Sequence, residues 1–234
     1  NGKTAQDTSG LDKKFADIQT MKKGRNWTHA KTAVDLLEVE LKAAENQDAL
    51  GTLYETRAGI DKMVQILAIE SDETRLTALV DFSTDEDPTV RAGIVWELRG
   101  ICEQEDAQRA ILNLTSDPVK SVAIAARQAM VQAGGPLSIP FLEEAIVSTA
   151  GTGGKQGDVA LARALEIDDP EVVPVLLKIL EVRSKAPAAA LRQVLNRLAE
   201  LGTPECVPAI KPFLQHADAE VAEVAKDVIA ELGG

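Results

Sequence analysis

Histidine and cysteine are the residue types most often used for metal binding and nucleophilic catalysis, and this 234-residue sequence contains two of each. His29 and His216 lie near opposite ends of the chain, without the clustering that a metal site requires. Only Cys206 and His216, one helix apart, could form a nucleophile–base pair, and two ordinary residues are the better explanation of that spacing. We therefore predict no catalytic residue, no metal site and no cofactor.

The glycine-rich stretch GTGGKQG, from Gly151 to Gly157, invites comparison with a phosphate-binding loop. Such a loop follows a β-strand and ends in Lys followed by Ser or Thr. Here Gln156 follows the lysine, and no strand is predicted before the stretch. We predict a flexible loop between two helices, long enough to be a candidate contact loop.

Acidic residues gather at predicted turns between helices, where carboxylates cap helix N-termini and meet water. The net charge of the chain is −12; residues 71–234 carry −11 of it, whereas residues 1–25 carry +3. This charge disfavours nucleic acid, and an acidic rim at the turns favours a protein or peptide partner with basic character. None of the clusters has the spacing of a calcium loop; they are Asp85-Glu86-Asp87, Glu103-Glu105-Asp106 and Asp168-Asp169.

The elements that carry these residues follow an internal repeat of 34 residues. The stretches PLSIPFLEEAI, PEVVPVLLKIL and PECVPAIKPFL begin at Pro136, Pro170 and Pro204. Each unit has the pattern of two helices, a first of about 10–12 residues and a second of about 14–16. Stepping back by the same interval gives five predicted units: 68–101, 102–135, 136–169, 170–203 and 204–234.

Aspartate and proline indicate where these helices begin. In Asp87-Pro88 and Asp117-Pro118 the carboxylate can cap a free backbone N–H, and proline suits the first helical position. Pro212 would lie in the middle of a helix, so we predict a kink near Lys211. The second prolines of the three stretches fall in the first turn, where a missing N–H costs nothing; they are Pro140, Pro174 and Pro208.

The units resemble HEAT repeats, in particular the short kind of the phycobilisome lyase proteins. The resemblance rests on Asp87-Pro88-Thr89-Val90-Arg91, on Asp117-Pro118-Val119-Lys120, on the Pro-x-x-[Val/Ile]-Pro starts and on the Ala-Glu-Leu-Gly ends at residues 199–202 and 230–233. Tetratricopeptide repeats share the period, but their aromatic positions are missing here. The resemblance implies an all-α, right-handed α–α superhelix of the armadillo type, with about five two-helix repeats behind a helical N-terminal cap. It also implies Asp–Arg pairs between neighbouring units, with Arg192 and Lys226 in the same role further along.

The same resemblance implies a non-catalytic scaffold or adaptor that binds a protein or peptide on the concave face, which second helices line. Trp96 is an aromatic residue at a position where other units have Ala199 or Ala230. The ring either fills a gap against the N-terminal cap or is a binding anchor. Our candidate partner-binding residues are Trp96, Arg99, Arg163, Asn196 and Arg197.

Two other classes of function remain as alternatives. An accessory subunit resembling the phycobilisome lyase HEAT proteins would handle a small-molecule or chromophore ligand, and would need a deep apolar pocket. A protein resembling the HEAT-type DNA glycosylases would need a basic groove, which the charge of −11 over residues 71–234 disfavours.

The N-terminal third is less regular than the repeats. We predict a polar, disordered tail at residues 1–10 and a helical cap at residues 11–67, with a degenerate repeat inside the cap as an open alternative. The expected helices cover residues 11–21, 28–45, 48–56 and 60–69, with Thr28 as the cap of the second.

Cys102 and Cys206 lie three units apart, about 27 Å if each unit adds one helix layer of about 9 Å. A disulfide needs Cα atoms within about 7 Å, so we predict two free thiols. Free thiols favour the cytoplasm over an exported location. No apolar run approaches the length of a membrane span, and the start at Asn1 without Met fits a fragment or a processed form. No oligomeric state is predicted.

Overall fold

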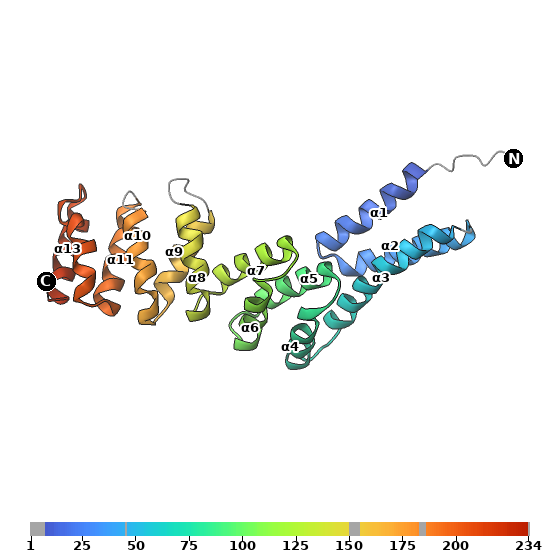
Figure 1. Ribbon diagram of the computed structural model, residues 1–234, viewed down its shortest axis with the longest axis horizontal. Coiled ribbons are helices and arrows are strands. Elements are labelled where there is room, and N and C mark those ends of the chain that lie inside the picture. The colour runs from blue at the N-terminus through green and yellow to red at the C-terminus, as the bar shows by residue number, and fades with distance from the viewer. Residues whose placement is uncertain (1–7, 45, 150–154, 183–185, 234) are drawn as a thin grey trace. The chain divides into compact units, whose positions relative to one another are not determined.

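A computed structural model describes residues 8–44, 46–149, 155–182 and 186–233, and this described part consists of helices and turns without a β-strand (Figure 1). Internal contacts divide the chain into two compact units, residues 1–125 and 126–234, and each unit is described by itself. The boundary falls inside helix α7 (Lys120–Ala133). The predicted fold class, all-α with about five two-helix repeats behind a helical N-terminal region, is confirmed.

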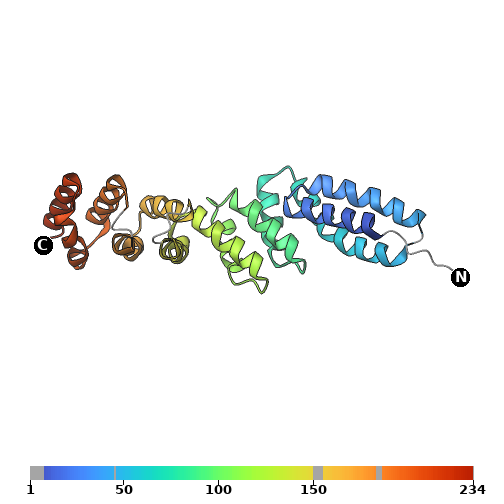
Figure 2. The ribbon, with the colours of Figure 1, turned by 90° about the horizontal axis from the view of Figure 1, so that it is seen from above.

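The first unit begins with three long helices, of which α1 packs on α2 and α2 packs on α3 (Figure 2). They are α1 (Thr8–Lys23), α2 (Trp27–Ala43) and α3 (Gln47–Leu67). Residues 1–7 of the predicted tail lie outside the described residues, whereas residues 8–10 already belong to helix α1 rather than to a disordered tail. The predicted cap at Thr28 is wrong, because α2 begins one residue earlier with Asn26 at the N-cap position.

The two short helices predicted over residues 48–56 and 60–69 are one continuous helix, α3, and that prediction is wrong as well. Gly59 weakens the helical pattern but does not break the helix. A Cβ atom at this glycine would clash with Oδ2 of Asp87. The glycine is therefore explained by the close approach of the turn before α5, and not by a helix end.

The rest of the chain consists of helix pairs, one in each predicted unit. In the first unit these are α4 (Asp72–Asp81) with α5 (Pro88–Arg99), joined through the 3₁₀ turn η1 (Phe82–Thr84), and α6 (Glu105–Leu114) with α7. In the second unit they are α8 (Ile139–Ser148) with α9 (Lys155–Glu166), α10 (Val173–Val182) with α11 (Ala188–Leu201), and α12 (Val207–Ile210) continued by η5 (Lys211–Gln215) with α13 (Ala219–Glu231).

The predicted helix start at Asp87-Pro88 is confirmed, whereas α7 begins at Lys120, two residues after the predicted first position at Pro118. Both aspartates nevertheless accept a backbone hydrogen bond. Oδ1 of Asp87 accepts from the Thr89 N–H at 2.7 Å, and Oδ1 of Asp117 accepts from the Val119 N–H at 2.8 Å. The prolines that open the last three units each begin a 3₁₀ turn that leads into the next α-helix; these turns are η2 (Pro136–Ser138), η3 (Pro170–Val172) and η4 (Pro204–Cys206).

The break expected at Pro212 is also confirmed. In the last repeat, the first helix is α-helical only over α12, which ends at Ile210. The chain continues as a 3₁₀ helix from Lys211. Proline cannot donate the hydrogen bond that would extend the α-helix through this point.

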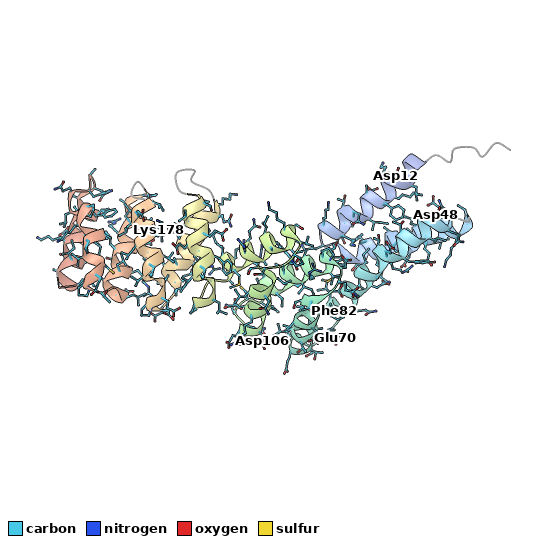
Figure 3. All side chains as sticks on the ribbon, viewed as in Figure 1. Asp12, Asp48, Glu70, Phe82, Asp106 and Lys178 are labelled. Atoms are coloured by element: carbon cyan, nitrogen blue, oxygen red, sulfur yellow. The ribbon has the colours of Figure 1, made fainter. Side chains whose placement is uncertain are left out.

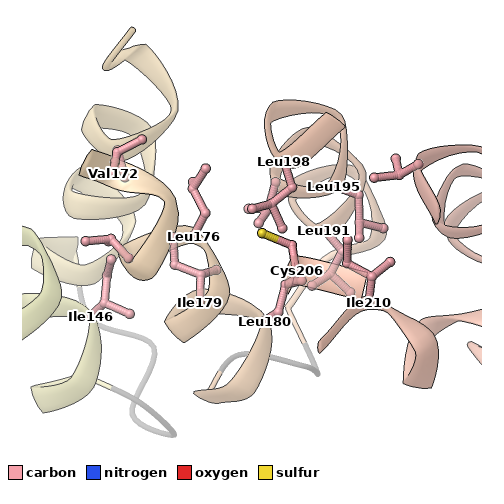
Figure 4. Packing of buried hydrophobic residues seen from close by; sticks show 14 of the residues in the cluster. Ile146, Val172, Leu176, Ile179, Leu180, Leu191, Leu195, Leu198, Cys206 and Ile210 are labelled. Atoms are coloured by element: carbon pink, nitrogen blue, oxygen red, sulfur yellow. The ribbon is translucent and has the colours of Figure 1, made fainter. Parts of the chain in front are cut away.

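Leucine, isoleucine and valine fill the cores, as the low aromatic content predicts. In the second unit Leu176 and Ile179 of α10 and Leu195 and Leu198 of α11 belong to one buried cluster that also contains Cys206 (Figure 4). Each such side chain contributes about 1.5–3 kcal/mol through its burial. The core of the first unit is of the same kind and includes Ile60, Met63, Ile94, Leu98 and Ile111.

Charged pairs connect neighbouring helix pairs inside each unit, as the resemblance implied. Nε and Nη2 of Arg91 on α5 donate to the carboxylate of Asp117, before α7, at 2.6 and 2.9 Å. In the second unit Arg192 on α11 pairs with Glu220 on α13. Lys226 makes no ion pair with any residue that the structure describes.

Candidate functional site

Trp96 lies on α5 between two arginine side chains, all in the first unit. The guanidinium carbon of Arg25 is 3.2 Å from the centroid of the Trp96 ring, and that of Arg99 is 3.8 Å from it. Arg25 belongs to the predicted cap, so the ring does contact that region, yet 38% of Trp96 stays exposed. The surface of this cluster therefore presents one aromatic ring together with two positively charged guanidinium groups.

Arg25 reaches Trp96 because of the turn that ends α1. The N–H of Arg25 donates to the carbonyl of Lys22, and the N–H of Asn26 donates to the carbonyl of Met21, which is the hydrogen-bond pattern of a Schellman C-cap. The left-handed position of that motif usually holds glycine, but here it falls on Arg25, with φ 60°. A non-glycine residue with such strain often marks a functional position.

Arg25 and Arg99 differ from the other arginines of the described residues, which each pair with a carboxylate. The side chain of neither residue makes an ion pair or a hydrogen bond within the part of the chain that the structure describes. Burial and then the charge of Arg99 lower the pKa of Arg25, and burial raises the pKa of the nearby Glu97 carboxyl. Positive charge is therefore concentrated here without a full counter-ion.

The strain at Arg25 can be measured by comparing two substitutions. Both Arg25→Gly and Arg25→Ala lose the cation–π contact, worth about 0.5–1 kcal/mol at an exposed site. Only glycine relieves the left-handed conformation, so we expect Arg25→Gly to be more stable than Arg25→Ala by about 1 kcal/mol. Urea denaturation of both variants measures the difference, and equal stabilities would contradict the strained backbone.

A groove of about 400 Å³ in the first unit adjoins this cluster and shares Arg25 with it. Lys22 and Lys23, at the end of α1, line one side, and residues at the starts of α5 and α7 line the other. We name the groove and the cluster together the α5 basic groove, after its basic residues Lys22, Lys23, Arg25 and Arg99. Sequence analysis missed the first three, although the charge of +3 over residues 1–25 was the available signal.

The remaining candidate residues lie in the second unit and have different surroundings. Arg163 pairs with Glu166 at 2.7 Å, and Asn196 is exposed. Arg197 is mostly buried: Nη2 donates to the carbonyl of Ile167 at 2.7 Å, and the guanidinium group also contacts Asp168 and Glu200. Of the five candidates, the structure thus brings only Trp96 and Arg99 into direct contact.

The second unit contains a larger groove of about 850 Å³, mostly apolar, between α10 and the segment α12–η5. Pro174 and Leu177 of α10 face Pro212 and Phe213 of η5 across it. Lys178, labelled in Figure 3, lies at this groove and forms an ion pair with Glu181 at 2.8 Å. Such a surface suits an apolar ligand or an apolar side chain of a partner.

The acidic cluster at residues 85–87 is only partly the solvated rim that the sequence suggested, because Glu86 is exposed but Asp85 and Asp87 are not. The side chain of Asp85 is 6% exposed and accepts from Lys62 Nζ at 2.6 Å. Asp87 lies 3.6 Å from Nζ of Lys22. Asp168, in the second unit, is by contrast exposed. Asp85 and Asp87 thus pair with cations inside the first unit, whereas Glu103, Glu105 and Asp106 are exposed as predicted.

The described residues contain no group of three His, Cys, Asp or Glu side chains that could hold a metal ion. Cys102 and Cys206 form no disulfide with each other within that part of the chain. Nδ1 of His216 accepts from the Asp218 N–H, and Cys206 lies in the core. No helix of the described residues is long and apolar enough to cross a membrane.

The predicted glycine-rich loop falls largely outside the described residues, which omit 150–154. Its last three residues, Lys155 to Gly157, form the first turn of α9, and the predicted loop is therefore too long at that end.

Comparison with known proteins supports the repeat architecture. Residues 73–152 match the family model described as HEAT repeats. No curated protein matches the sequence. The matched segment runs from α4 to α8, and helix pairs of similar length follow it among the described residues up to Glu231. Residues 73–152 are therefore similar to HEAT repeats.

Proposed function

We propose that this chain is a non-catalytic protein-interaction scaffold or adaptor that binds a protein or peptide through the second helix α5 at Trp96. HEAT repeats are generally protein-interaction scaffolds. The observation that carries the proposal is the half-exposed Trp96 ring held between Arg25 and Arg99. Tryptophan and arginine are the residue types most enriched at the energetic centres of interfaces.

Rigid presentation of the ring supports the same conclusion. Two stacked guanidinium groups hold the indole before a partner arrives, so little side-chain entropy is lost when it binds. Arg163, Asn196 and Arg197 remain candidates for contacts in the second unit. The net charge of −12 supports the exclusion of nucleic acid from the set of partners.

Affinity capture from a lysate of the source organism tests the proposal. We expect wild-type protein to retain a specific partner, and the amount retained by Trp96→Ala to be lower by about tenfold or more. The purified partner should also bind purified wild-type protein when the two are mixed. Tyr54→Ala is the matched control, because Tyr54 is an exposed aromatic residue on α3 in the same unit. A partner retained equally by Trp96→Ala, with unchanged circular dichroism, would contradict binding at Trp96.

The apolar groove supports a second candidate function, that of an accessory protein for a small-molecule or chromophore ligand, resembling the phycobilisome lyase HEAT proteins. Its volume of about 850 Å³ lies within the range of small-ligand sites. Protein purified from its native source would then carry a visible absorption band that disappears on denaturation and extraction. Colourless protein with no extractable ligand would contradict this candidate.

A further inference from the structure

We propose that the α5 basic groove recognises an acidic peptide segment, one whose Asp or Glu side chains meet Lys23, Arg25 and Arg99 while its backbone passes over Trp96. This inference rests on the proposed function and specifies the chemistry of the partner. It departs from the expectation of a basic partner, which followed from the charge of the whole chain and not from the charge of this surface.

The groove follows one face of α5. Thr89, Ala92, Trp96 and Arg99 are spaced three or four residues apart, so they form one continuous stripe along the helix. The stripe is about 15 Å long at 1.5 Å per residue, which corresponds to about five residues of extended peptide. The small side chains of Ala92 and Ala125 line the groove and leave room for a backbone.

The cations along this stripe lack partners of their own. Lys23, Arg25 and Arg99 form no ion pair within the described residues. Two acidic groups face the groove cations: Asp87 lies 3.6 Å from Nζ of the buried Lys22, and Glu97 attracts Arg25 without forming an ion pair. These two carboxylates stand against the four cations of the α5 basic groove, so the set retains an excess of positive charge.

Guanidinium groups stacked on a ring are well prepared to bind carboxylates. Stacking uses the flat face of the group and leaves its N–H donors in the plane, where a carboxylate can accept two hydrogen bonds. The charge of −12 on the whole chain opposes an anion at long range, but charges further than about 8 Å are screened at physiological salt. Close contacts therefore decide which peptide the groove accepts, and lysine or arginine side chains would meet uncompensated cations.

Fluorescence anisotropy with labelled peptides tests the proposal on the whole chain. The probe is a fluorescein-labelled heptapeptide of alternating Glu and Ser, and the comparison peptides replace Glu with Gln or Lys. We expect the Glu peptide to bind about tenfold or more tightly than either comparison peptide, and to weaken as salt is raised. Binding of the Lys peptide equal to or tighter than that of the Glu peptide would overturn the inference without any variant.

Substitutions then locate the site. Arg25→Gln combined with Arg99→Gln is expected to weaken binding of the Glu peptide by about tenfold or more. Arg109→Gln removes a charge from an exposed arginine on α6 in the same unit and should change the affinity by less than about twofold. Equal losses in both variants would show a diffuse charge effect and overturn the assignment to the groove.

The two proposals fail in different ways. If a lysate partner depends on Trp96 but the Glu peptide does not bind, the scaffold function stands and the acidic chemistry is wrong. If the Glu peptide binds in the groove but no protein partner depends on Trp96, the groove is an acidic-peptide site and the scaffold proposal at Trp96 is wrong.

Discussion

Replacing Asp117 with alanine is expected to lower the free energy of unfolding of the first unit by about 3 kcal/mol. The side chain of Asp117 is 3% exposed, and its loss leaves Arg91 as a buried cation without its counter-ion. Broken buried pairs usually cost about 3–5 kcal/mol. We expect the lower value, because Arg91 keeps its hydrogen bonds to the carbonyl groups of Asp85 and Glu86.

Urea denaturation followed by tryptophan fluorescence measures this effect in the first unit alone. Trp27, Trp96 and the single tyrosine, Tyr54, all lie within residues 1–125. Glu105→Ala is the control, because it breaks an exposed pair with Arg109 and should cost about 0.5 kcal/mol or less. Similar losses in the two variants would contradict the structural importance of the Arg91–Asp117 pair.

The same pair makes stability depend on pH in a defined direction. Hydrogen bonds from Arg91 hold the pKa of Asp117 below its ordinary value, against the opposing effect of burial. The stabilisation is therefore fully present above the unfolded pKa of about 3.9 and is lost as the pH falls through the folded pKa. On acidification below about pH 4, wild-type protein should lose more stability than Asp117→Asn, which lacks the titrating carboxyl.

The repeat spacing predicts much of the fold, because the ends of the helices depend on interactions between residues close together in the sequence. Aspartate before proline caps a helix whatever surrounds it, and Pro212 removes a hydrogen bond donor from its own helix. Gly59 shows the limit of such rules: it suggests a helix break from the sequence, but its role depends on contact with Asp87, 28 positions away in the sequence.

The candidate site was predictable only in part. The position of Trp96 in the repeat identified it as unusual, and Arg99 lies near it on the same helix. Arg25 could not be found in this way, because Gly24 precedes it and glycine is the expected residue at a left-handed helix end. The stack forms only because the turn after α1 approaches α5, and local sequence does not encode that contact.

Arg197 illustrates the same limit in the second unit, where we expect Arg197→Ala to lower the free energy of unfolding by about 2 kcal/mol. The substitution leaves the Ile167 carbonyl without its donor and removes contacts with Asp168 and Glu200, and hydrogen bonds of charged groups contribute about 1.5–3 kcal/mol.

The neighbouring Asn196→Ala is the control for this expectation and should change stability by less than about 0.5 kcal/mol, because Asn196 is exposed. Residues 126–234 contain neither tryptophan nor tyrosine, so fluorescence follows the first unit alone in urea. Far-ultraviolet circular dichroism follows the helices of both units, and the second unit accounts for the part of its change that does not coincide with the fluorescence change. A side chain that holds neighbouring repeats together cannot be removed without a loss of stability. If Arg197→Ala is as stable as the wild type but no longer binds a partner, Arg197 is instead a residue that contacts the partner.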